Sequence, residues 1–448
     1  MRGDVVRRGK EGVPEVLQGP GLRLDASPPF WSRLRARLIR AGAGNLSLGL
    51  LDQALLSGSA FALTLALANF LEVHAFGRFS VAWSFSILIE SVFLRGLFDD
   101  GLPAAAQRIP RRLWPQLRFG LYSSALVVSG SIGLAIMLAG MIGPGVPAEW
   151  SRLAVATGLA VPAIRMQSVY RRIAYLDGRT TRAALSSLVY CLALLISTAV
   201  MIWTGEEGPA AAMSCIAVSA TTAGALALLH RSDLARSRRQ VLVSSLTRLL
   251  RGGRWFIATS LTYWVGSIGL IPFCSLLLGL EAGATLRILL LIFAPLSQFN
   301  QTIVSVRLPE IAEKLRAGPR LAIRAVARDF VALLGLTSVA YGAVVAMGGE
   351  WVMSIMVGSK SYQLGFANLA LMALAMTLDS VWLGLALPLF AVGQPQRFLA
   401  SRLAGLLSLC CALPVAIWLW GLPGAIVGMV VSSAVSVVVS MRTNWMPS

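Results

Sequence analysis

Apolar runs alternate with short polar segments along the chain, from near Ser47 to Ser440. Each run is about twenty residues long, the length that an α-helix needs to cross about 30 Å of hydrocarbon. The pattern predicts an all-α integral membrane protein with about twelve transmembrane helices, six on each side of a basic central segment. The expected spans are 47–71, 77–97, 118–142, 151–168, 184–203, 210–229, 255–279, 284–306, 325–348, 366–391, 401–420 and 422–441.

The segments outside these spans complete the domain organisation. Residues 1–30 are rich in Gly, Pro and charge and are expected to form a disordered cytoplasmic tail. Residues 31–46 place Trp31 and Leu34 among arginines, which predicts a short amphipathic helix at the membrane surface. The remaining parts are an N-terminal six-helix lobe at 47–229, a basic cytoplasmic linker at 230–254, a C-terminal six-helix lobe at 255–441 and a cytoplasmic tail at 442–448.

The distribution of basic residues predicts the orientation. Of the 448 residues 56% are hydrophobic and 13% are charged, and the formal net charge is +19. If both termini are cytoplasmic, all but four of the 39 basic residues fall on the inner side; the exceptions are Arg78, Arg152, Arg287 and Lys360. Because basic loops stay in the cytoplasm, this asymmetry favours an N-in, C-in arrangement. It also accounts for the net charge without a nucleic-acid partner.

The two halves of the chain carry traces of a duplication. Residues 71–78 align with residues 280–287 at an offset of 209 and keep Leu, Glu, Ala and Arg at four of eight positions. Residues 38–42 and 249–253 correspond at nearly the same offset. Each copy would begin at the cytoplasmic face and contain six spans, so the repeats would be parallel, as in many transporters.

The composition leaves little material for catalysis or metal binding. The five cysteines lie in apolar runs without CxxC spacing, and His74 and His230 are the histidines. A GxxxxGK[ST] phosphate loop is absent from the sequence, so ATP is not expected to be the direct energy source. We therefore expect a protein that is not an enzyme and that needs no cofactor.

Three carboxylates fall inside predicted spans: Asp52 in the first, Glu90 in the second and Asp379 in the tenth. A charge at the centre of a span costs roughly 2.5 to 3.5 kcal/mol on insertion scales, so each needs a reason. One interpretation is an ion-coupling site in a hydrated cavity, and the other is a structural ion pair. For Glu90 the structural interpretation is favoured, because Arg95 lies close by in the sequence.

The eighth predicted span carries a polar stripe. Arg287, Gln298 and Gln301 follow helical spacing with Leu291 and Ala294, Asn300 adds polarity, and Pro295 predicts a kink. Polar stripes avoid lipid, so this one either lines a cavity or bonds helix to helix. A cavity with arginine and amides suits an anionic, sugar-bearing substrate. Further substrate-cavity candidates are Tyr263 in the seventh span, Arg165 in the fourth and Arg254 before the seventh, although positive-inside topology alone explains both arginines.

Several local motifs point to a known family. The turn Phe76-Gly77-Arg78-Phe79 precedes the second span, and residues 99–108 after it read D-x-G-L-x-x-A-x-x-R. A glycine-bearing loop at Gly358, the tenth span with Asp379 and a short turn at 393–394 follow in the second half. These segments resemble bacterial polysaccharide flippases of the Wzx type, within the superfamily that also holds multidrug and toxic compound extrusion (MATE) transporters.

The resemblance implies two six-helix lobes in a MATE-like V that opens alternately to each side of a bacterial inner membrane. It implies undecaprenyl-diphosphate-linked oligosaccharide as cargo, a precursor of exopolysaccharide, O-antigen or capsule, and membrane lipids, glycosyltransferases and a polymerase as partners. Two alternatives stay open. One is an ion-coupled small-molecule or multidrug antiporter of the same superfamily, and the other is a membrane-embedded polysaccharide polymerase or ligase, which the short outer loops disfavour.

Overall fold

The computed structural model describes residues 43–90, 114–229, 257–303, 321–349, 365–391 and 395–445, together with Trp351, Val357 and Tyr362. The chain divides into two units, Met1–Ser47 and Leu48–Ser448. Of the first unit only residues 43–47, the start of one helix, are described, and every contact below lies within the second. The predicted tail at 1–30, most of the amphipathic segment 31–46, the linker 230–254 with Arg254, and the motif residues 99–108, 358 and 393–394 lie outside the described residues.

Helices account for nearly all of the described residues. The first half of the chain forms α2 (Ala43–Phe70), α3 (Val73–Ile87), α5 (Trp114–Ile142), α6 (Ala148–Leu176), α7 (Thr180–Thr204) and α8 (Pro209–Leu229). The second half forms a segment Ile257–Leu278 that ends in α10 (Leu270–Leu278), then α11 (Leu280–Ile292), a segment Ala294–Ile303, α13 (Leu321–Met347), α15 (Phe366–Ala391), α16 (Pro395–Trp420) and α17 (Leu422–Trp445).

Each of the twelve predicted spans corresponds to one of these helical segments, which confirms the all-α membrane fold. Among the described residues nine helices are long and apolar enough to cross a membrane, and the bent pair of α11 and Ala294–Ile303 makes a tenth. The other two predicted spans are α3 and α6. The helix α6 runs from Ala148 to Leu176, well past the predicted 151–168. The apolar run ends before the helix does. The helix continues because arginine is a good helix former and because Arg165 and Arg171 pair with carboxylates of other helices.

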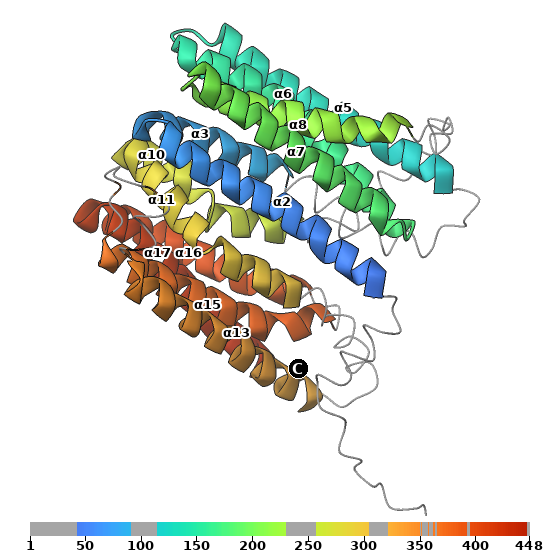
Figure 1. The fold of residues 1–448 in the computed structure, drawn as a ribbon. Helices are drawn as coiled ribbons and strands as arrows, with labels where there is room; N and C mark the ends of the chain where they lie inside the picture. Colours follow the sequence, from blue (N-terminus) through green and yellow to red (C-terminus); the bar gives the residue numbers. More distant parts are fainter. Residues whose placement is uncertain are drawn as a thin grey trace, which may run out of the picture. The chain divides into compact units, whose positions relative to one another are not determined.

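The helices gather into two groups that follow the two halves of the sequence. Contacts join α5, α6, α7 and α8 in one group and α13, α15, α16 and α17 in the other. Between them, α3 contacts α6 and α8 as well as α10 and α11 (Figure 1). The packing of α3 on α10 and α11 is therefore one contact between the halves.

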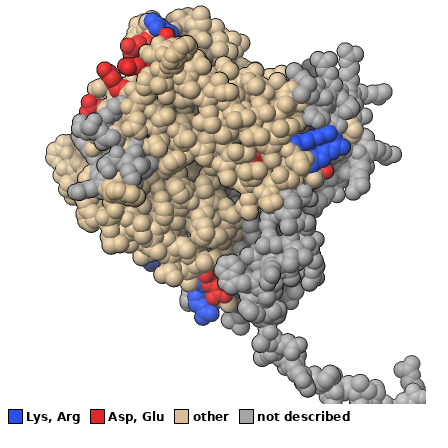
Figure 2. Space-filling view, in the orientation of Figure 1, with Lys and Arg blue, Asp and Glu red and all other residues tan. Residues whose placement is uncertain are grey.

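The outer surface is apolar over a wide area. Figure 2 shows a broad face of uncharged side chains, with the charged residues mostly near its margins. Large hydrophobic side chains such as Val127, Ile196 and Leu336 are more than half exposed. A patch of this kind would be a liability in water and suits contact with lipid, so the chain is a multi-pass membrane protein.

The helices α5 and α6 approach each other through glycines. A Cβ added at Gly133 would lie 2.3 Å from the carbonyl oxygen of Gly158, and one at Gly158 would lie 2.5 Å from the carbonyl oxygen of Gly133. Helices in membranes associate through van der Waals packing, and small residues let their backbones come close. The α5–α6 hairpin therefore depends on these two positions having no side chain.

We expect Gly158→Ala to lower the stability of the protein, because the new methyl group must push α5 away from α6. Overpacking of this kind costs about 1–3 kcal/mol, which thermal unfolding in detergent would register as a lower Tm. The matched control is Gly130→Ala on α5, where an added Cβ meets nothing within 4 Å. Equal melting temperatures for the two variants would contradict the assignment.

Candidate functional site

Asp52 of α2 lies inside the first half and is only 1% exposed. Its carboxylate accepts hydrogen bonds from Arg171 and Tyr175 of α6 and, at 2.6 Å, from Ser187 of α7. Buried charges are tolerated when they are paired and their lone pairs are satisfied. The ion pair ties α2 to α6 and α7, and a cation could bind Asp52 only by displacing Arg171.

Glu90, just past the end of α3, also has a partner on α6. It lies 3.3 Å from Arg165 and accepts a hydrogen bond of 2.7 Å from Ser168. The structural pairing expected for Glu90 is thus made with another helix, whereas Arg95 lies outside the described residues. Arg165 is 1% exposed, so in this structure its guanidinium faces Glu90 in the helix interior and not an open cavity.

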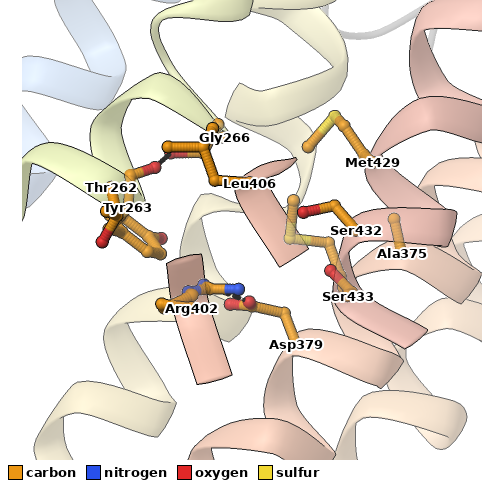
Figure 3. A pocket seen from close by; sticks show the side chains of 12 residues that line it. Thr262, Tyr263, Gly266, Ala375, Asp379, Arg402, Leu406, Met429, Ser432 and Ser433 are labelled. Carbon is orange, nitrogen blue, oxygen red and sulfur yellow. Dashed lines mark hydrogen bonds and ion pairs between the residues drawn. The ribbon is translucent and has the colours of Figure 1, made fainter. Parts of the chain in front are cut away.

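Asp379 of α15, for which an ion-coupling site and a structural ion pair were both open, pairs with Arg402 of α16. The guanidinium of Arg402 lies 3.9 Å from the ring centroid of Trp382 and 5.2 Å from that of Tyr263. Figure 3 shows Asp379 and Arg402 facing each other beside Tyr263. Because aromatic rings attract cations, with energies of about 2 kcal/mol when both are desolvated, Arg402 is held by two rings as well as by Asp379.

This ion pair lines a small pocket in the second half. The pocket has a volume of about 20 Å³, enough for one water molecule or a small ion. Its polar lining combines the ion pair with side chains from the segment Ile257–Leu278 and from α17, namely Thr262, Tyr263, Ser267, Ser432 and Ser433. Tyr263, predicted to line a substrate cavity, therefore lines this pocket, and Asp379 is the predicted coupling carboxylate that opens onto it.

The two halves meet closely at the end where α2 turns into α3. A Cβ at Gly77 would lie 2.4 Å from the carbonyl oxygen of Leu280, so α3 and the start of α11 are in backbone contact. His74 lies 3.1 Å from Glu281 across the same contact. Both of these side chains are more than half exposed, and such pairs contribute about 1 kcal/mol or less. Backbone packing at Gly77 therefore contributes more to holding the halves together at this end than the His74–Glu281 pair does.

Tyr362 adds to the closed end. Its hydroxyl donates a hydrogen bond of 3.0 Å to the carbonyl oxygen of Ala68 in α2, and its ring packs edge-on against Phe76. Burial raises the pKa of the Tyr362 hydroxyl to about 12, so it stays protonated and remains a donor. At this end the halves are thus joined by backbone packing, an aromatic contact and one hydrogen bond.

The predicted eighth span is bent by 45° between Ile292 and Ala294. Pro295 explains the bend, because proline lacks the N–H that would bond to the preceding turn. The hydroxyl of Tyr341 donates a hydrogen bond of 2.7 Å to the carbonyl oxygen of Ile292 at the bend. The predicted kink is confirmed, and a side chain from α13 compensates for the interrupted backbone.

Arg287, on α11 before the bend, differs from the paired arginines. Its guanidinium donates to the hydroxyl of Thr64 in α2 at 3.4 Å, and its Nε is buried without a hydrogen-bond partner. No carboxylate of the described residues lies within ion-pair distance of it. Arg287 is therefore a cation between the two halves, and no described carboxylate balances its charge.

The amides of the eighth span separate onto two faces. Gln298 bonds at 3.1 Å to Gln53 of α2, on the face that also holds Arg287. Asn300 is 7% exposed and donates at 2.8 Å to Ser380 of α15, so it joins helices inside the second half. Gln301 is exposed. Gln53 was missed by the sequence analysis, although its spacing from Ser57 and Thr64 by four and eleven residues was a usable helical signal.

Solved transporter structures share this fold. The lipid II flippase MurJ in an inward closed conformation matches with a TM-score of 0.69 and 9% identity, over 89% of this chain and 87% of that chain. An inward-facing multidrug resistance MATE transporter of the MOP superfamily gives 0.64 and 15%, over 88% and 93%. The eukaryotic MATE transporter AtDTX14 gives 0.59 and 15%, over 90% and 97%. No protein-family model and no curated protein matches the chain.

The chain therefore has the fold of these transporter structures. The two arginines that align at the offset of 209 residues, Arg78 and Arg287, differ in their partners. Arg78 pairs with Glu149 at the start of α6, whereas Arg287 turns to Thr64 between the halves. Of these two arginines, Arg78 is thus neutralised, whereas Arg287 has no ion-pair partner among the described residues.

We expect Arg171→Leu to destabilise the protein by about 3 kcal/mol, because it leaves the Asp52 carboxylate buried without its cation. The double variant Asp52→Leu/Arg171→Leu should recover most of the loss. Thermal unfolding of the purified protein in detergent measures both. If the single variant melted like the unmodified protein, the pair would not hold these helices together.

We expect Gly77→Ala to weaken closure between the halves, because the added methyl group collides with the Leu280 carbonyl. The rate of disulfide formation in His74→Cys/Glu281→Cys, in a background without other cysteines, reports how often this end is closed. Gly77→Ala should slow it several-fold. Gly58→Ala on α2, where a Cβ meets nothing within 4 Å, should leave the rate unchanged, and an equal effect of both variants would contradict the role of Gly77.

Proposed function

We propose that this protein is a flippase that moves a diphosphate-linked lipid oligosaccharide, such as an undecaprenyl-linked precursor of surface polysaccharide, across the bacterial inner membrane by alternating access. The observation that carries the proposal is Arg287, a guanidinium between the two halves with no carboxylate of the described residues to balance it. The chemistry is recognition and release, with no covalent step.

The charge of Arg287 selects for an anion. Keeping an unpaired cation at membrane depth costs free energy, so such residues mark substrate or ion pathways. A guanidinium offers parallel N–H donors that match the oxygens of a phosphate or diphosphate. A lipid diphosphate entering between the halves would supply the missing counter-charge.

The amides on the same face as Arg287 suit the sugar part of the same substrate. Gln298 and Gln53 lie on the facing sides of the two halves, three helical turns away from Arg287 and Thr64. Amides hydrogen-bond with hydroxyl groups, and they carry no charge that would compete for the diphosphate. The pairing of one cation with neutral polar groups favours a glycan carrier over a purely apolar compound.

We propose Asp379 as the carboxylate that couples transport to an ion. It lines the pocket beside Tyr263 and is 27% exposed, whereas Asp52 is enclosed by its donors. A proton or small cation that binds Asp379 would release Arg402, which the aromatic rings would still hold. Asp52 and Glu90 then have a structural role, because each forms an ion pair with α6 within the first half in this conformation.

The alternative is an ion-coupled small-molecule or multidrug antiporter, because the MATE transporters share the fold. It is weakened by Arg287, since a cationic compound would be repelled from the space between the halves. The two proposals differ in what the cell loses: the antiporter predicts drug sensitivity without any change in surface glycan.

We expect a deletion strain to lose a surface glycan and to accumulate its lipid-linked precursor on the cytoplasmic side. Lipid extraction with mass spectrometry measures the precursor, and surface labelling measures the glycan. Glycosyltransferase and polymerase genes beside this gene would identify the pathway. Unchanged surface glycan together with increased drug sensitivity would overturn the flippase proposal in favour of the antiporter.

We expect Arg287→Gln and Asp379→Asn each to reduce glycan export at least tenfold while the protein still reaches the membrane. The first removes the phosphate ligand and the second removes the coupling charge. The matched controls are Arg328→Gln and Asp329→Asn on α13, where both side chains are exposed to more than 70%. Full export by either site variant would refute the role of that residue.

A further inference from the structure

Two polar stripes face each other across the halves. On α2, Gln53, Ser57 and Thr64 are spaced by four and seven residues and share one face. Thr64 contacts Arg287, and Gln53 contacts Gln298. Along α2 the two contacts are eleven residues apart, from Gln53 to Thr64. Along the bent span they are also eleven residues apart but in the reverse order, from Gln298 to Arg287. The two segments therefore run antiparallel and side by side. The two contacts are about 16 Å apart along α2.

The amide contact is not saturated. The Nε2 of Gln53 donates to the Oγ of Ser57 and to the Oε1 of Gln298, both at 3.1 Å. The Oε1 of Gln53 and the Nε2 of Gln298 have no partner among the described residues. An amide–amide bond always uses one donor and one acceptor, so one acceptor and one donor group stay open whichever way the two amides are turned.

A ligand for these groups must donate one hydrogen bond and accept another. A hydroxyl group does both through a single oxygen, whereas a phosphate only accepts and an ammonium only donates. Gln53 is exposed, and lipid would leave its amide unsatisfied at a cost of several kcal/mol. The open groups therefore point to a polar, hydroxyl-bearing ligand in the space between the halves.

We infer that Gln53 and Gln298 form a hydroxyl-recognition pair that binds a sugar farther along the glycan, about 16 Å from the diphosphate at Arg287. The inference rests on the proposed function. It adds Gln53 to the substrate-binding residues and assigns the anionic group and the sugar to different side chains. Arg287 binds the anionic group common to all lipid diphosphate carriers, and the amide pair distinguishes a glycosylated carrier from a bare one. Because each half supplies one glutamine, the pair exists only while the halves are together at this point, and their separation releases the sugar.

Binding of a glycosylated and a bare carrier tests whether the amide pair recognises the sugar and Arg287 the diphosphate. The probes are a polyprenyl diphosphate that bears a neutral oligosaccharide long enough to extend from Arg287 to the amide pair and the same polyprenyl diphosphate without sugar, titrated against the full-length protein in nanodiscs. Gln53→Met and Gln298→Met keep the side-chain length and remove the amide. Each should weaken binding of the glycosylated carrier about fivefold, the loss expected for one hydrogen bond, and should leave the bare carrier within twofold.

Two comparisons separate the outcomes. Arg287→Gln should weaken both carriers alike, and Gln396→Met, at an exposed glutamine on α16, should change neither. Melting temperatures confirm that each variant is folded. If the methionine variants weaken both carriers equally, or neither, the recognition pair is refuted while the proposed function stands. If the unmodified protein binds neither carrier, the proposed function itself fails and the inference fails with it.

Discussion

The organising constraint of this protein is the lack of water around charged groups inside the membrane. A guanidinium or carboxylate there is stable only with a partner, because desolvation costs several kcal/mol per ion. Asp52, Glu90 and Asp379 each meet an arginine from a neighbouring helix of the same half. These pairs fix which helices are neighbours, and they make each half resistant to rearrangement.

Contacts between the halves are of another kind. They include the backbone approach at Gly77, the hydroxyl of Tyr362 on a carbonyl oxygen, and the indole of Trp264, which donates at 3.0 Å to the carbonyl oxygen of Ser84. The other contacts described above are the exposed pair His74–Glu281 and the polar contacts of α2 with the bent span. Neutral hydrogen bonds of this type contribute about 1 kcal/mol net and can be exchanged for bonds to water or ligand. Strong pairs within the halves and weak contacts between them fit the alternating access that we propose for this protein.

Much of the fold could be predicted from the sequence because helix positions depend on local hydropathy and on local residues such as proline. Hydropathy located all twelve helical segments, and Pro295 located the bend. The partners of the charged residues could not be predicted, since Asp52 and Arg171 are 119 positions apart and nothing local states that α2 and α6 touch. Likewise Asp379 and Arg402 are 23 positions apart on different helices, so no local pattern pairs them. Gln53 carries no charge, and the cost of burying a charge singles out Asp52 and not the neighbouring amide.

Arg78 and Arg287, which align at the offset of 209 residues, show two fates of an arginine inside a membrane protein. Glu149 neutralises Arg78, which becomes part of the scaffold. Among the described residues, Arg287 meets the hydroxyl of Thr64 and no carboxylate. A protein that needed only stability would gain by pairing or replacing Arg287, so its unbalanced charge supports the proposal that an anion binds there and leaves again.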